Sequence, residues 1–215
     1  MISLRDLRAT TGRLSWMNGR DLADPDLAII TDASPQGVGV ILCYVNFAKG
    51  ELDPWAAMEA PVRKEDADWL ALEFGEASSQ GALEAWAVLL AVRMWKTGLR
   101  GVPLLVKSGS TAELAIAQKL SSPSPAANWV GAELALRLEL VDVPRLIVHH
   151  LPGRFNVEAD WLSEQSAEVP WTLRGIKIHR FEGEARRKSQ VPPPGIAPQL
   201  WGIQSETILQ AFESL

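Results

Sequence analysis

Three carboxylates in this chain stand at positions where rigid structural elements are expected. Asp32 ends an apolar run over residues 27–31, and Asp160 follows the segment His-Leu-Pro-Gly-Arg-Phe-Asn at residues 150–156. Glu84 is the only charged residue between positions 82 and 92. Carboxylates held together by rigid elements bind hard cations such as Mg²⁺, and a pair of such ions can catalyse phosphodiester hydrolysis. We therefore take the three acids as candidate metal ligands.

Each acid also has a plain structural interpretation. Asp32 could be a turn residue, Glu84 could lie in the exposed first turn of its helix, and Asp160 could be a surface helix residue. An unpaired carboxylate on a buried helix is costly, however, and a bound cation would compensate Glu84. The order of the three acids, on a strand, a helix and another helix, is more specific than any one of them.

Hydrophobic periodicity and turn residues predict the elements that would position these acids. Strands are predicted at residues 27–31, 38–47, 55–60, 102–106 and 145–150. Helices are predicted at about residues 63–68, from Gly81 to Met94, and at 111–120, 126–140 and 156–165. The helix after Gly81 is apolar nearly all round, so it should be buried against a sheet. This order predicts an α/β fold with a mixed five-stranded sheet and helices on both faces.

The bulk composition is typical of a soluble globular protein. Of the 215 residues, 47% are hydrophobic and 22% are charged, and no apolar stretch is long enough to span a membrane. The start of the chain does not resemble a signal peptide, and the single Cys43 excludes an internal disulfide. We expect a protein of a reducing, intracellular compartment with no membrane partner. The net charge of −5 argues against strong non-specific nucleic-acid affinity, although a local basic surface remains compatible with it.

The sequence predicts three parts. Residues 1–24 are expected to form a helical extension, and residues 25–166 the domain that carries the acids. Residues 167–215 are expected to form a basic, Pro-rich tail. Its linker is Pro192-Pro193-Pro194-Gly195, and a short amphipathic helix follows, with Ile208, Leu209, Phe212 and Leu215 on one face.

Several segments together resemble the ribonuclease H domain of retrotransposon reverse-transcriptase polyproteins, especially those of gypsy-type and DIRS-like elements. Residues 31–40 are similar to the first hairpin of that domain, and residues 84–95 to its carboxylate-bearing helix. Residues 122–128 and 132–136 resemble the segment between, and residues 150–153 with Asn156, Ala159, Asp160, Leu162 and Ser163 resemble the closing motif. The resemblance covers about residues 27–165. Residues 4–16 also resemble the helix that links the polymerase to this domain.

The resemblance implies a ribonuclease H-like fold and Mg²⁺-dependent endonucleolytic cleavage of the RNA strand in an RNA/DNA hybrid. It implies that Asp32, Glu84 and Asp160 are the catalytic metal ligands of a two-metal site. The chain departs from the family at Gly109, where the family pattern places a metal-binding aspartate between two flanking residues that Ser108 and Ser110 match. Glycine brings no ligand, so we expect weak or absent activity. An alternative is that the turn needs a glycine for a positive φ, which would still leave the site one carboxylate short.

A second functional hypothesis is an inactive, domesticated protein that serves as a structural or docking subunit. Docking would use the basic stretch, the Pro-rich linker and the tail helix as a surface for a protein partner. We expect His150, at the end of an apolar strand, to pack or to form hydrogen bonds rather than to act as a base. Candidate contacts to nucleic acid or to a partner are Trp161, Arg154, Arg174, Lys177, Arg180, Arg186, Arg187 and Lys188.

Overall fold

The computed structural model describes residues 25–46, 48–73, 77–110, 117, 119, 124–164 and 170–182. The strands are β1 (Leu27–Ala33), β2 (Gly37–Asn46), β3 (Glu51–Pro61), β4 (Leu104–Ser108), β5 (Leu146–His150) and β6 (Lys177–Arg180). The helices are α1 (Lys64–Leu70), α2 (Ala77–Met94), α4 (Pro125–Val141) and α5 (Val157–Glu164), with short 3₁₀ turns η2 (Gly153–Phe155) and η3 (Trp171–Leu173). None of these helices combines the length and the apolar composition that a membrane crossing requires. The N-terminal extension, most of the helix predicted at 111–120, and the tail from residue 183 onward lie outside the described residues.

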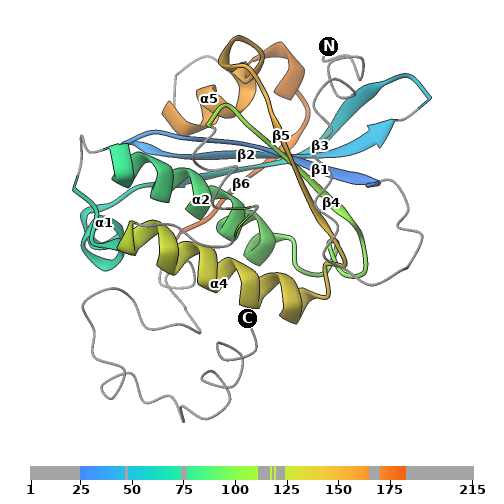
Figure 1. The fold of residues 1–215 in the computed structure, drawn as a ribbon. Coiled ribbons are helices and arrows are strands. Elements are labelled where there is room, and N and C mark those ends of the chain that lie inside the picture. Colours follow the sequence, from blue (N-terminus) through green and yellow to red (C-terminus); the bar gives the residue numbers. More distant parts are fainter. Residues whose placement is uncertain are drawn as a thin grey trace.

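The strands form one mixed sheet in the order β5-β4-β1-β2-β3-β6 (Figure 1). Strands β1, β2 and β3 form an antiparallel meander, and β4 and β5 continue the sheet in parallel with β1. Helices α2 and α4 cover one face, and α5 covers the other. The predicted α/β architecture, with helices on both faces of a mixed sheet, is confirmed.

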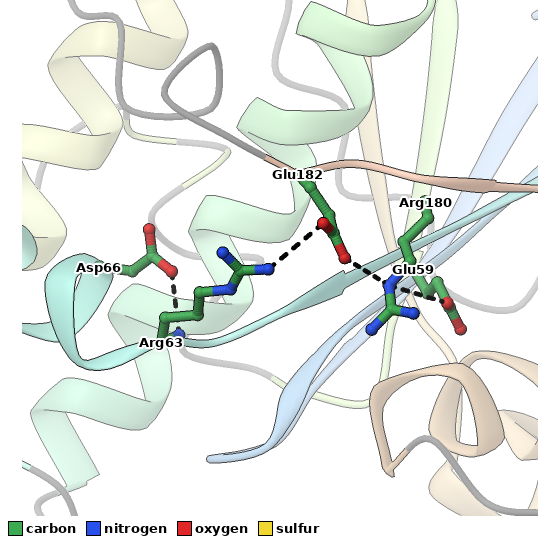
Figure 2. A network of polar contacts seen from close by, with 5 residues as sticks. All are labelled: Glu59, Arg63, Asp66, Arg180 and Glu182. Atoms are coloured by element: carbon green, nitrogen blue, oxygen red, sulfur yellow. Dashed lines mark hydrogen bonds and ion pairs between the residues drawn. The ribbon is translucent and has the colours of Figure 1, made fainter.

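The prediction of five strands is wrong, because β6 adds a sixth strand parallel to β3. This strand lies in the segment that the sequence assigned to the tail, and its Ile178 packs against the core beneath α5. Figure 2 shows the ion pairs at its end, where Arg180 lies 2.6 Å from Glu182 and 3.6 Å from Glu59, and Arg63 lies 3.3 Å from Glu182. All four side chains are partly exposed, so these pairs contribute little, about 0–1 kcal/mol each.

Helix α2 is the central core helix, as its apolar sequence predicted. It begins at Ala77 rather than after Gly81, so the predicted start was too late. The eight residues 85–92 are all buried between the sheet and α4. The bulkiest of them, Trp86, is fully buried. A charged side chain that faces both a sheet and a second helix is costly to bury unless it is paired, which explains the near absence of charge in this stretch.

Helix α5 approaches the opposite face of the sheet closely at Gly39 on β2. A Cβ atom at Gly39 would lie 2.6 Å from Leu162 Cβ and 2.8 Å from the backbone nitrogen of Ser163. Only glycine allows this contact. Because Gly39 pairs with Asp32 across β1 and β2, the contact also brings α5 next to Asp32. The residues packed between the sheet and α5 form a second hydrophobic core. Cys43 is fully buried in this second core, as expected for a small core residue.

Candidate functional site

The site lies where β1 and β4 end side by side. The two strands are parallel neighbours, and Thr31 pairs with Ser108. Parallel strands place their carboxyl ends at the same edge of the sheet, so Asp32 and Gly109 follow this pair at adjacent positions. Helix α5 carries Asp160 beside them, and α2 carries Glu84.

Asp32 is held by two donors from the α5 region. The Asn156 side-chain amide donates to the Thr31 carbonyl at 3.0 Å and to Asp32 Oδ1 at 3.1 Å. The Ser163 hydroxyl donates to Asp32 Oδ2 at 2.8 Å. Both carboxylate oxygens therefore have a protein hydrogen bond.

The acids interact electrostatically. Burial raises the pKa of Asp32 from 3.8 to about 6; the hydrogen bond from Ser163 opposes this shift, and the negative charges of Asp160 and Glu84 add to it. Asp32 is therefore partly protonated near pH 6. Burial limits its contact with water, and no cation among the described residues stabilises its charge fully. The structure brings the three predicted acids into one charged cluster.

Hydrogen bonds link Glu84 to the ends of both β1 and β4. The Gln80 amide donates to the Ala33 carbonyl at 2.6 Å and to Glu84 Oε1 at 3.2 Å. Burial raises the pKa of Glu84, whereas hydrogen bonds from Ser110 and Gln80 lower it. Ser110, next to Gly109, therefore contacts the carboxylate directly.

The structure decides between the alternative interpretations of the acids. Asp32 lies within β1, so its interpretation as a turn residue is wrong. Glu84 lies about two turns into α2 and is half-buried, so the exposed first turn is also wrong. Asp160 is exposed on α5, which agrees with a surface helix residue as well as with an acid facing the site.

Position 109 has room for a side chain. The positive-φ glycines of the described residues are Gly50, Gly101 and Gly175, so Gly109 is outside the left-handed region. A Cβ atom at position 109 would lie 3.6 Å from the Leu151 carbonyl oxygen and 4.0 Å from Gly153 Cα, which are ordinary contacts. The interpretation that this turn needs glycine is therefore wrong. Aspartate can occupy this position without backbone strain.

The acids do not fit a complete metal site. Within the described part of the chain, no group of three or more His, Cys, Asp or Glu side chains is arranged to hold a metal ion. Asp32 and Glu84 instead accept hydrogen bonds from protein donors, and Gly109 supplies no ligand.

The donors that hold the acids were not predicted from the sequence. Gln80 was missed because the helix was expected to start after it. Ser163 lies three residues after Asp160, a spacing that puts both residues on one side of a helix. That spacing was the available signal for a side chain directed at the acid cluster.

The other predicted contact residues are spread over the surface around α5 and β6. Arg154, Arg174, Lys177 and Arg180 are exposed, whereas Arg186, Arg187 and Lys188 lie outside the described residues. Lys177 and Arg180 belong to β6, so in this part the basic stretch forms a strand of the sheet.

Trp161 and the two histidines occupy different environments. Trp161 is half-buried and packs against the second core, and its indole N–H is buried without a hydrogen-bond partner in the described region. It therefore contributes mainly to packing. Burial and the nearby charge of Lys107 lower the pKa of His149. His150 is exposed at the end of β5 rather than packed.

No family model and no curated protein matches the chain. Among solved structures, the fold is similar to LC11-RNase H1, isolated from compost by a metagenomic approach. The identity is 19% over 66% of this chain and 95% of that one, with a TM-score of 0.46. A second structure of that protein, in complex with an RNA/DNA hybrid, gives a TM-score of 0.47 at 19% identity over 65% and 95% of the two chains. The foamy viral protease-reverse transcriptase in complex with dsDNA gives 0.42 at 16% identity over 66% and 94%.

Proposed function

We propose that this chain is a ribonuclease H-fold domain of retroelement descent. With glycine at position 109, it binds nucleic acid at the end of the sheet but cleaves the RNA strand of an RNA/DNA hybrid weakly or not at all. The observation that carries the proposal is the convergence of Asp32, Glu84 and Asp160 beside an open position at Gly109. The motifs of residues 27–165 supply the link to retroelements.

Mg²⁺ is the cofactor that this proposal implies. Asp32, Glu84 and Asp160 would be its ligands, and bound cations would supply water activation and stabilisation of the leaving oxygen. With Gly109 in place, the residues do not form a complete site for these ions. We therefore propose that the chain with Gly109 lacks the full set of metal ligands that cleavage requires.

A second candidate function is an inactive structural or docking subunit. The hydrogen bonds at the acids support it, because Ser163 and Asn156 satisfy Asp32 while Gln80 and Ser110 satisfy Glu84. Such bonds hold β1, β4, α2 and α5 together without a cation. In this case the cluster is a structural junction, and a protein partner would dock through the tail.

Substituting Gly109→Asp separates the two candidates. We expect cleavage of the RNA strand in a hybrid to rise about 100-fold or more with Mg²⁺ or Mn²⁺, since metal ligation supplies several kcal/mol of transition-state stabilisation. With chelator, the thermal midpoint should fall modestly, because the new charge joins an acidic cluster. A Mn²⁺ titration by calorimetry should show weak binding for the chain as written and tighter binding for the variant.

Two matched variants control this experiment. Gly109→Asn adds a side chain of the same size without the charge. Gly98→Asp adds the same charge on an exposed turn, where a Cβ atom would lie 3.7 Å from the Trp95 carbonyl oxygen. Neither should raise cleavage. If Gly109→Asp folds and binds Mn²⁺ but does not cut, the docking-subunit function is the better one.

A further inference from the structure

The short turn η2 carries a cation, Arg154, and an aromatic ring, Phe155. The residues immediately before and after this pair both lie next to the candidate site. Before the pair, Gly153 Cα lies 4.0 Å from the position a Cβ atom would take at residue 109. After the pair, Asn156 donates to Asp32. Arg154 and Phe155 therefore sit between two residues that contact the site.

Packing does not account for this pair. Phe155 is 42% exposed and the neighbouring Val157 is 55% exposed. The Arg154 guanidinium carbon lies over the Phe155 ring, 4.8 Å from its centre, in a cation–π arrangement. No carboxylate of the described residues forms an ion pair with Arg154. Within the described part of the chain, the cation is therefore open to an anion from outside the protein.

The charge of the neighbourhood indicates which ligand this surface suits. Three carboxylates close together repel a phosphate backbone, so a strand that approaches them needs a cation at the rim of the site. Proteins that bind nucleic-acid strands combine cations for the phosphates with aromatic rings for the bases. Arg154 and Phe155 supply one of each.

We propose that Arg154 and Phe155 form a substrate platform for the RNA/DNA hybrid. The Arg154 guanidinium binds a backbone phosphate, and the Phe155 ring, extended by Val157, supports the adjoining sugar or base. The platform fixes the strand at the entrance to the acid cluster. This inference rests on the proposed function, because it assumes that the site takes nucleic acid.

Binding of a fluorescent RNA/DNA hybrid to the full chain tests the platform. The titrations are made in EDTA, where cleavage plays no part, across about 50–200 mM salt. Arg154→Ala should weaken binding and reduce the slope of log K against log salt by roughly 0.9, the loss of one phosphate contact. Phe155→Ala should weaken binding about five- to 150-fold with an unchanged slope.

Arg100→Ala is the matched control. Arg100 is exposed and precedes β4, at the end of that strand opposite to the site, so its removal should change neither affinity nor slope. All three variants change exposed side chains and should keep the thermal midpoint of the original chain.

The outcomes separate the platform from the proposed function. If the original chain binds the hybrid and the Arg154 and Phe155 variants bind equally well with the same slope, the platform is wrong while the nucleic-acid function stands. If the original chain binds no hybrid even at low salt, both fail and the surface is assigned to a protein partner.

Discussion

Glu133 in the helix layer and the acids at the end of the sheet are two sets of buried or half-buried carboxylates whose charge is compensated in opposite ways. Between α2 and α4, Glu133 is fully buried and accepts hydrogen bonds from Arg93 at 3.0 Å and from Arg137 at 2.7 Å. At the end of the sheet, Asp32 and Glu84 are half-buried and receive hydroxyl and amide donors, with no cation partner in the described part of the chain.

The pKa shifts show what the difference means. Burial raises the pKa of Asp32 to about 6 and also raises that of Glu84. In the helix layer, burial lowers the pKa of Arg93, and the charge of Glu133 opposes that shift. The core charges therefore compensate one another, whereas the acids of the sheet end carry an uncompensated charge. Carboxylates left in that state are typical of sites that meet a cation or a substrate.

The largest stability effect should come from breaking the compensated region. Glu133→Gln leaves two guanidinium groups without their shared anion, which should lower the free energy of unfolding by about 3–5 kcal/mol. Urea denaturation measures this loss. Glu139→Gln, on an exposed position of the same helix, should change it by less than about 0.5 kcal/mol. A Glu133 variant as stable as this control would mean that the buried ion pairs contribute nothing.

Removing a charge from the uncompensated region should have the opposite sign. Asp32→Asn keeps the size of the side chain, removes the cost of burying its charge and relieves the repulsion from Asp160 and Glu84, so we expect about 1–2 kcal/mol of stabilisation at pH 7 in chelator. The pKa shift from 3.8 to about 6 sets an upper bound of about 3 kcal/mol, and partial exposure reduces it.

The pH dependence of the Asp32 effect follows from the same shift. Between about pH 4 and 6, folded Asp32 retains its proton while the unfolded chain loses it. The contribution of Asp32 to stability therefore falls as pH rises through this window and stays low above it. Thermal unfolding should show little difference between the original chain and Asp32→Asn near pH 4 and the largest difference at pH 7. An equal difference at both pH values would contradict an uncompensated Asp32.

The smallest effect is expected at the exposed ion pairs of Figure 2. Glu182→Gln removes an ion-pair partner of both Arg63 and Arg180, leaving Glu59 beside Arg180, and these side chains are already partly in water. We expect a loss below about 1 kcal/mol in urea denaturation. A loss as large as that of Glu133→Gln would mean that the ion pairs, rather than strand pairing and packing, hold β6 in the sheet.

Much of the site was predictable because its signals are local. An apolar run ending in Asp32 predicts a strand with an acid at its end, and the lone charge at Glu84 marks a buried helix. Strand β6 was not predictable in this way. It has four residues, three of them basic or histidine, and it exists because it pairs with Ala56–Glu59 of β3, far earlier in the chain.

The sequence by itself determined the kind and order of most elements and the positions of the three acids. These follow from residue type and from spacing along one element. Only the tertiary structure decided that position 109 can hold a side chain, that Gly39 admits α5, and which donors satisfy Asp32 and Glu84. Each of these depends on atoms from segments far apart in the chain, and their distances are fixed only when the sheet and its helices have packed.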